Sequence, residues 1–215
     1  MESSIVPDPA MTEIIDRVLE PFKDQLDKIV GETATPLNRY TMLESTMDNF
    51  LLQSIMEVSG AELAFSNGWR YGAPVIPGPV TINDLYNIIP MDPPIGTVQL
   101  TGEELLNMLE ENLERTFAAD PFDQMGGYIK RGLGLTVYFK IENPVGQRIQ
   151  QVFVGNEPVE RSRRYHTAFV TEQGVPRQYG SQRKELKTHA VEAMETYLSK
   201  HNPMHAQLRG TYIPV

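Results

Sequence analysis

Apolar residues near the N-terminus recur at intervals of three and four positions, which is the spacing of one helix face. Asp8 is a candidate N-cap, and Pro9 occupies the first helical position, where its missing N–H removes no hydrogen bond. Pro21 predicts a kink or a break. We expect a connector helix over residues 1–30 that lies on the domain and ends at Gly31. A dimerising coiled coil is disfavoured because only about three heptads are available.

Four further segments carry helical spacing. Ser45 with Asp48 three residues later is typical of a capping box, and Thr101 with Glu104 shows the same pattern more clearly. These helices are predicted at residues 45–58, 81–87, 102–117 and 185–200.

Short runs of β-branched and aromatic residues predict strands. Gly155-Asn156 lies between two apolar stubs and indicates a hairpin, and the Gly and Pro residues of segment 67–80 indicate a loop. Helices and strands alternate irregularly, so the predicted class is α+β, with a mixed β-sheet flanked by helices. Strands are predicted at residues 61–65, 98–100, 135–141, 152–159, 165–171 and 211–213.

Composition narrows the function classes. The 215 residues include 19 Lys and Arg against 28 Asp and Glu, a net charge of −9, which argues against a nucleic-acid binder. The absence of cysteine excludes disulfides, thiolate nucleophiles and Cys-ligated metal sites. No apolar run is long enough to span a membrane, and the N-terminal residues do not have the pattern of a signal peptide.

Histidine offers little support for chemistry. His201 and His205 have the spacing of a helical metal pair, but Pro203 between them makes a regular helix doubtful, so solvated histidines are favoured. His166 falls in a predicted strand and is interpreted as structural. The sequence contains no zinc-protease, phosphate-loop or nucleophile-elbow motif.

Charge is unevenly placed. Residues 101–125 hold seven acids and one base, and residues 161–187 hold seven bases and two acids. Two solvated faces explain this distribution, and an anion-attracting mouth near the basic stretch is the alternative.

Segment 66–74 is the most unusual part of the chain. It places Asn67, Trp69, Arg70 and Tyr71 on a glycine-bounded loop directly after a strand. Arginine grips an oxyanion with its fork, asparagine orients a ligand, and aromatic rings stack on planar groups. The loop is therefore a candidate ligand site, with Trp69 packed inward in a purely structural loop as the alternative.

Several motifs in order resemble the C-terminal domain of the bacterial 5′-nucleotidase family of metallophosphoesterases. The resemblance covers roughly residues 31–215 and implies a substrate-binding domain, preceded by a connector helix at residues 1–30. The motifs are ESTMDNFL at residues 44–51, AELAFSNG at 61–68, GPVT to LYNIIP at 78–90 and VQLTGEEL at 98–105.

The resemblance places catalysis outside this chain. The family's N-terminal metallophosphoesterase domain holds two divalent metals with Asp-x-His, Gly-Asn-His and Gly-His-x-His motifs, and none of these occurs here. We therefore expect no catalytic residue, metal or cofactor in this chain, which alone should be inactive. The implied partners are that N-terminal domain and a small anionic substrate such as a nucleotide, in the periplasm or outside the cell.

Substrate residues are carried over by position. Asn67, Gly68 and Arg70 match the family's substrate loop in kind, with Trp69 or Tyr71 beside them. Met91 stands where the family has a purine-stacking Phe, and because methionine has no π face, Tyr179, Tyr128 or Trp69 is considered as a substitute.

Two alternatives stay open. Loop 68–72 and the stretch around Gln124, Gly126 and Gly127 resemble the thiosulfohydrolase branch of the superfamily, which acts on sulfur carried by a protein. The two glycines would let backbone approach a ligand closely. A free-standing binding domain without catalysis is the other alternative.

Overall fold

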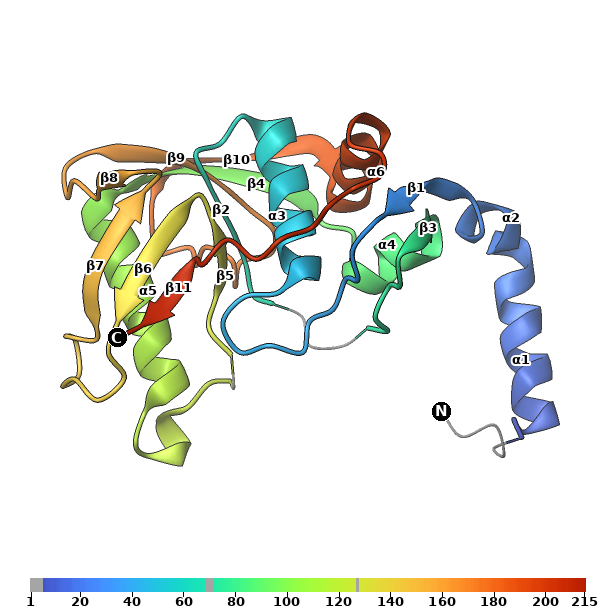
Figure 1. Cartoon of the computed structure of the whole chain (residues 1–215), viewed down its shortest axis with the longest axis horizontal. Helices are drawn as coiled ribbons and strands as arrows, with labels where there is room; N and C mark the ends of the chain where they lie inside the picture. The colour runs from blue at the N-terminus through green and yellow to red at the C-terminus, as the bar shows by residue number, and fades with distance from the viewer. Residues whose placement is uncertain (1–5, 69–71, 127) are drawn as a thin grey trace.

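The computed structural model describes residues 6–68, 72–126 and 128–215. Three sheets form the described framework. Strands far apart in the sequence lie side by side in the larger two, and parallel and antiparallel pairs occur in both (Figure 1). The strands are β1 Ile29–Thr33, β2 Leu63–Ser66, β3 Gly78–Thr81, β4 Pro94–Thr101, β5 Arg131–Leu133, β6 Leu135–Phe139, β7 Ile149–Val154, β8 Glu157–Pro158, β9 Arg164–Phe169, β10 Ser181–His189 and β11 Tyr212–Pro214.

The five-stranded sheet has the order β10-β4-β9-β2-β5, and the four-stranded sheet has the order β11-β6-β7-β8. A two-stranded sheet pairs β1 with β3. The class is α+β with mixed sheets, as the sequence predicts. The helices are α1 Pro9–Leu19, η1 Glu20–Phe22, α2 Lys23–Leu26, α3 Thr46–Ser59, α4 Ile82–Ile88, α5 Gly102–Phe117, η2 Pro121–Asp123 and α6 Ala190–Lys200.

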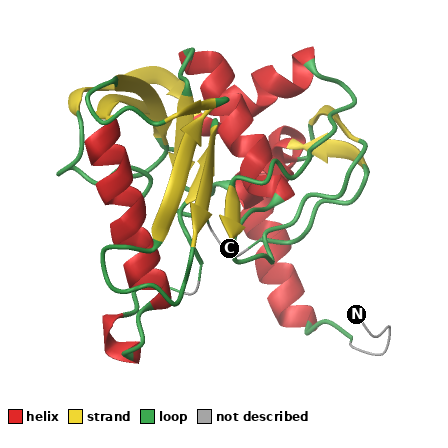
Figure 2. Ribbon diagram, turned by 60° about the vertical axis from the view of Figure 1, so that its left-hand side comes forward, coloured by secondary structure: helices red, strands yellow, loops and turns green. Residues whose placement is uncertain are grey.

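Two hydrophobic cores hold these layers together. One joins α3, α4 and α6 to a face of the five-stranded sheet. The ring centroids of Phe50 and Tyr197 lie 5.9 Å apart within it. The other joins α5 to both large sheets. Figure 2 shows α5 and the pair α3 and α6 on different sides of the strands. The five-stranded sheet is therefore covered on both faces.

Capping signals give the most accurate helix boundaries. Thr101 and Glu104 form the predicted capping box, and α5 has the predicted bounds. Thr81 and Asp84 form a second box at α4. Ser45 caps α3 by accepting from the Asp48 N–H at 3.1 Å.

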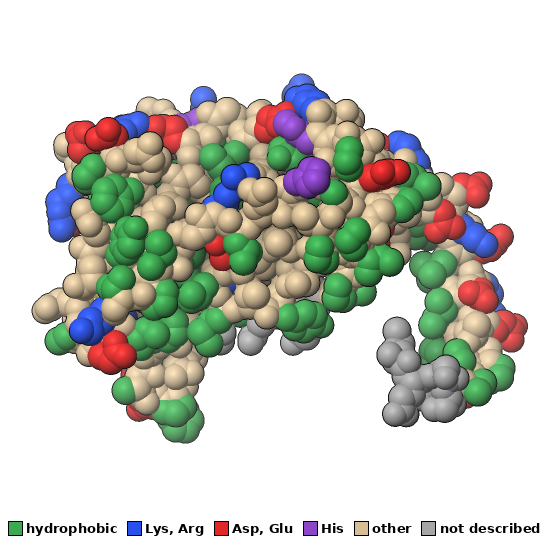
Figure 3. Space-filling model, in the orientation of Figure 1, with side chains coloured by type: hydrophobic (Ala, Val, Ile, Leu, Met, Phe, Trp, Pro, Cys, Tyr) green, Lys and Arg blue, Asp and Glu red, His purple; other side chains and the backbone are tan. Residues whose placement is uncertain are grey.

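Three predictions from the sequence are wrong. The first helix breaks near Pro21 as expected, but Gly31 does not end it, because Gly31 lies in β1. No residue of α1 is buried, so α1 does not lie on the domain. In Figure 3, hydrophobic side chains follow the side of α1 that is turned toward the body. Residues 185–189 continue β10, because pairing with β4 outweighs their helical spacing. The predicted loop 67–80 contains the start of β3, which pairs with β1.

A buried ion cluster ties β5 to the start of α3. Arg131 Nε lies 3.0 Å from Asp48 Oδ2, and Arg39 Nε donates to Asp48 Oδ1 at 3.1 Å. Burial lowers the pKa of Arg39, and the neighbouring Asp48 opposes this shift. The terminal nitrogens of Arg131 donate to the carbonyl oxygens of Thr41 and Met42. The cluster fixes the strand edge beside which the candidate site opens.

Candidate functional site

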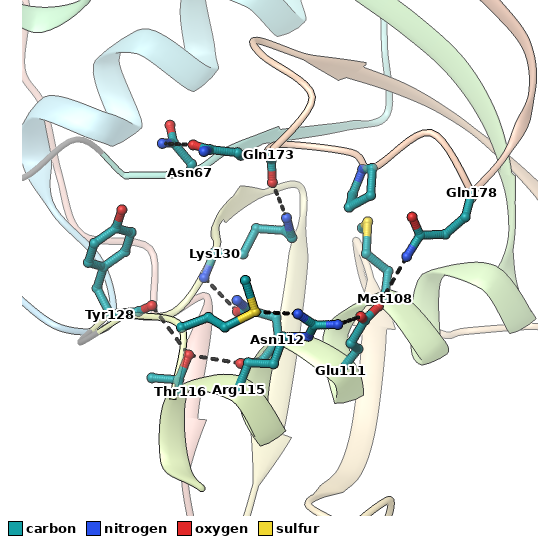
Figure 4. Close-up of a pocket in the computed structure, with 13 residues that line it drawn as sticks. Asn67, Met108, Glu111, Asn112, Arg115, Thr116, Tyr128, Lys130, Gln173 and Gln178 are labelled. Carbon is teal, nitrogen blue, oxygen red and sulfur yellow. Dashed lines mark hydrogen bonds and ion pairs between the residues drawn. The ribbon is translucent and has the colours of Figure 1, made fainter. Parts of the chain in front are cut away.

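A pocket of about 390 Å³ opens between α5, the residues before β5 and the loop that follows β9. Most of the residues that line it carry a polar side chain, and several side chains point into it (Figure 4). The described lining residues are Asn67, Met108, Glu111, Asn112, Arg115, Thr116, Met125, Gly126, Tyr128, Lys130, Gln173, Pro176 and Gln178.

Two contacts direct the Lys130 side chain into the pocket: one holds its own backbone, and the other holds the neighbouring Arg131. The Lys130 N–H donates to Asn112 Oδ1 on α5 at 2.7 Å. Arg131, the next residue, points to the Asp48 cluster. Successive side chains of an extended chain point in opposite directions, so this anchoring directs Lys130 toward the pocket.

The upper wall is a short chain of hydrogen bonds. The Lys130 ammonium donates to the Gln173 carbonyl oxygen, and Asn67 Nδ2 donates to the Gln173 side-chain oxygen (Figure 4). Asn67 Oδ1 is buried and has no hydrogen-bond partner among the residues that the structure describes. Burial lowers the pKa of Lys130 from its ordinary 10.5 to about 8, while the charge of Glu111 acts in the opposite direction.

On the lower wall, the charges of the lining residues are paired with one another. Arg115 pairs with Glu111 at 2.6 Å, one helical turn apart on α5, and also contacts the Met125 sulfur. Tyr179 donates to the other Glu111 oxygen at 2.7 Å. Burial, followed by this hydrogen bond, raises the pKa of Tyr179 to about 12, so the phenol stays a neutral donor. Gln178 Nε2 donates to the same Glu111 oxygen at 3.5 Å, so three side chains already engage this carboxylate.

The structure divides the predicted substrate residues. Asn67 and Gly126 line the pocket, and Tyr179 reaches it through Glu111. Gly68 instead packs on Arg131: a Cβ there would lie 2.6 Å from Arg131 Nε, and its φ is +64°. Gln124 donates to the Ala118 carbonyl at 2.8 Å and is not among the lining residues.

Other predicted residues lie elsewhere. Met91 follows α4, is 74% exposed, and is not among the described residues that line the pocket. The predicted ligand residues Trp69, Arg70, Tyr71 and Gly127 lie outside the described residues.

The basic stretch does not converge on the pocket. Arg161 pairs with Glu103 and Arg163 with Glu62. Arg183 donates to backbone carbonyls of the loop before β10. These local contacts favour solvated faces over an anion-attracting mouth at this stretch.

The histidines and carboxylates do not form a metal centre in the described part of the chain. His201 contacts Glu57 at 2.8 Å, and Lys200 shares that carboxylate. Across residues 6–68, 72–126 and 128–215, no three His, Asp or Glu side chains are grouped to hold a metal ion. Within the same ranges, no helix has the length and apolar character needed to cross a membrane.

Sequence reasoning missed Lys130, Gln173 and Asn112. Each stands in an unremarkable local sequence, and the partners that give it a role are distant: Asn112 lies 18 positions from Lys130, and Gln173 lies 43 positions from it.

The sequence model of the family described as 5′-nucleotidase, C-terminal domain matches residues 29–171. The chain belongs to this family. The matched segment includes Asn67 and Lys130 and ends at Thr171, just before the loop that contributes Gln173. This 5′-nucleotidase C-terminal domain therefore builds its pocket mainly from family-matched elements.

Several known proteins resemble this chain in sequence or in fold. A trifunctional nucleotide phosphoesterase of Bacillus subtilis is 25% identical over 146 residues, which is 62% of this chain and 10% of that protein. The fold matches a Thermus thermophilus sulfate thiohydrolase, SoxB, with a TM-score of 0.86 at 24% identity, over 98% of this chain and 39% of that one. It also matches a 5′-nucleotidase precursor from Thermus thermophilus with a TM-score of 0.80 at 20% identity, over 98% and 44%. The chain thus spans less than half the length of these relatives.

Proposed function

We propose that this chain is the substrate-recognition domain of a metal-dependent phosphohydrolase of the 5′-nucleotidase type. The pocket lined by Asn67, Lys130 and Gln173 carries the proposal, because it combines a cation with amide groups in a fold that belongs to this family. Pockets with a few convergent polar groups are the usual ligand sites of proteins. The ligand class we assign is a nucleotide or a related phosphoester.

Each wall group has a proposed part in binding. Asn67 has a free amide oxygen among the described residues and suits a donor on a base or sugar. Lys130 suits an anionic group. Tyr128 lies along one side of the pocket in Figure 4, where its ring can lie against a planar base.

Hydrolysis is assigned to another domain. The described residues offer no cluster for a metal pair, so the divalent metals of the proposed enzyme would lie in an N-terminal metallophosphoesterase domain. The relatives' greater length supports this arrangement. The exposed apolar side chains of α1 and η1, among them Ile14, Val18 and Phe22, support residues 1–30 as the connector to it.

Nucleotide catabolism and a periplasmic or extracellular location belong to the same proposal and rest on the resemblance to the family. Fractionation of source cells with an antibody against this chain tests the location, and recovery with the cytosolic fraction would contradict it.

Thermal unfolding tests nucleotide recognition. Adenosine or adenosine 5′-monophosphate at millimolar concentration should raise the melting temperature, because a ligand that binds only the folded state stabilises it. Asn67→Ala should abolish the rise. Asn107→Ala, at an exposed position of α5, serves as the matched control and should leave it intact. Absence of a shift with every nucleotide tried would contradict the proposal.

A second candidate is a domain of a thiosulfohydrolase-like enzyme that contacts a carrier-protein tail. The exposed position of Met91 favours it, since no ring stands there to stack on a purine. Capture of a sulfur-carrier peptide, without any nucleotide-induced shift, would select this candidate.

A further inference from the structure

The two cations among the described lining residues differ in what neutralises them. Arg115 has its carboxylate, Glu111, within 2.6 Å. The ion pairs of the described residues do not include Lys130, whose ammonium donates to a neutral carbonyl, that of Gln173. With Lys130 and Arg115 against Glu111, the described lining carries one positive charge in excess.

An ammonium in such a place is poised for an anion. Lys130 is only 7% exposed, so water screens its charge poorly. An ammonium has three donors, and one of them is used by Gln173. The pocket beside it is large enough for a small anion, and the buried oxygen of Asn67 marks further unused hydrogen-bonding capacity among the described groups.

We propose that Lys130 is the residue by which this pocket selects anionic ligands over neutral ones, and that its protonation makes this selection depend on pH. The inference rests on the proposed function for the identity of the ligand, but Lys130 would bind a phosphate group whatever carries it. Anion binding favours the charged ammonium, and loss of its proton removes the attraction.

The other charged groups around Lys130 are held by partners of their own. On α5, Glu111 and Arg115 form an ion pair. On the loop after β9, Tyr179 donates to Glu111 and its pKa is raised to about 12. The neighbouring Arg131 is buried against Asp48. Tyr128 lies on the same segment as Lys130 and also lines the pocket. Phosphate monoesters lose their second proton near pH 6, so the charge of such a ligand is nearly constant between about pH 7 and pH 9.

Calorimetric titration of the 215-residue chain tests the inference with inorganic phosphate, adenosine and adenosine 5′-monophosphate. We expect the monophosphate to bind more tightly than adenosine, and its affinity to fall as the pH rises from about 7 to about 9. Lys130→Met should lower the affinity for the monophosphate by about tenfold to a hundredfold and leave the affinity for adenosine unchanged. Lys130→Arg should keep the preference and lose the pH dependence, since arginine stays charged.

Lys187→Met, at an exposed position of β10, is the matched control and should behave as the unmodified chain. A monophosphate preference that survives Lys130→Met would overturn the inference. If phosphate binds in a Lys130-dependent way while neither adenosine nor its monophosphate binds better than phosphate alone, the inference stands and the nucleotide proposal fails. If no phosphate-bearing compound binds, both fail.

Discussion

Two neighbouring cations at the edge of β5 have opposite surroundings. Arg131 is 2% exposed, faces Asp48 at 3.0 Å, and donates to two backbone carbonyls. Lys130 is 7% exposed and donates to a single carbonyl, without an ion pair among those of the described residues. The comparison teaches that burial alone does not assign a role. Arg131 has every sign of a structural residue, whereas Lys130 has a charge that the described residues leave uncompensated.

Removing Asp48 tests the structural role assigned to Arg131. Asp48→Ala leaves the buried Arg39 and Arg131 without their shared carboxylate, and should lower the free energy of unfolding by about 3–5 kcal/mol. Urea denaturation measures the loss. Asp123→Ala, at an exposed position, should change stability by less than about 0.5 kcal/mol. Equal effects of the two variants would mean that the cluster does not hold β5.

Stability against pH should separate Lys130 from the paired arginine. The folded-state pKa of Lys130 is lowered to about 8, so between there and 10.5 the unfolded chain binds more protons than the folded one. Stability therefore rises with pH across this window. Lys130→Met should be the more stable form near pH 7, and its advantage should shrink by roughly 2 kcal/mol by about pH 9.5.

Lys187→Met is again the control and should show a constant difference from the unmodified chain across the same range. A constant difference for Lys130→Met as well would show that the Lys130 ammonium is not desolvated in the folded protein.

The smallest effect is expected from the Gln173 side chain. Lys130 donates to the Gln173 backbone carbonyl, which Gln173→Ala retains, while Asn67 loses its side-chain partner. We expect a loss of about 1 kcal/mol or less in stability and no change in the pH response of Lys130. A changed pH response would mean that the side chain, rather than the backbone, sets the environment of the lysine.

Local signals predicted the parts of the fold that local interactions decide. The N-cap residues of α3 and α5 and the Gly155-Asn156 turn satisfy backbone groups within a few positions, so the sequence predicts them well. Residues 185–189 have helical spacing but pair with β4, which lies about ninety positions earlier. The spacing of apolar residues within this segment does not reveal that it pairs with β4.

The candidate site was predictable only where one loop supplies it. Asn67 follows a strand in a ligand-like loop and lines the pocket, whereas Lys130 is placed there by contacts with α5 and with the loop after β9. At Gly68, also predicted to meet substrate, the close approach of Arg131 requires a glycine. Contacts between distant segments decided each of these outcomes.

The most direct measurement is the pKa of the Lys130 ammonium itself. Carbon-13 NMR of a lysine-labelled chain, with the Lys130 signal identified by its absence from Lys130→Met, reports that pKa in the free chain and with adenosine 5′-monophosphate. We expect about 8 in the free chain, rising by about one unit when the nucleotide is bound, because the anion favours the charged form. A pKa near the ordinary value of about 10.4 that the nucleotide leaves unchanged would contradict the account.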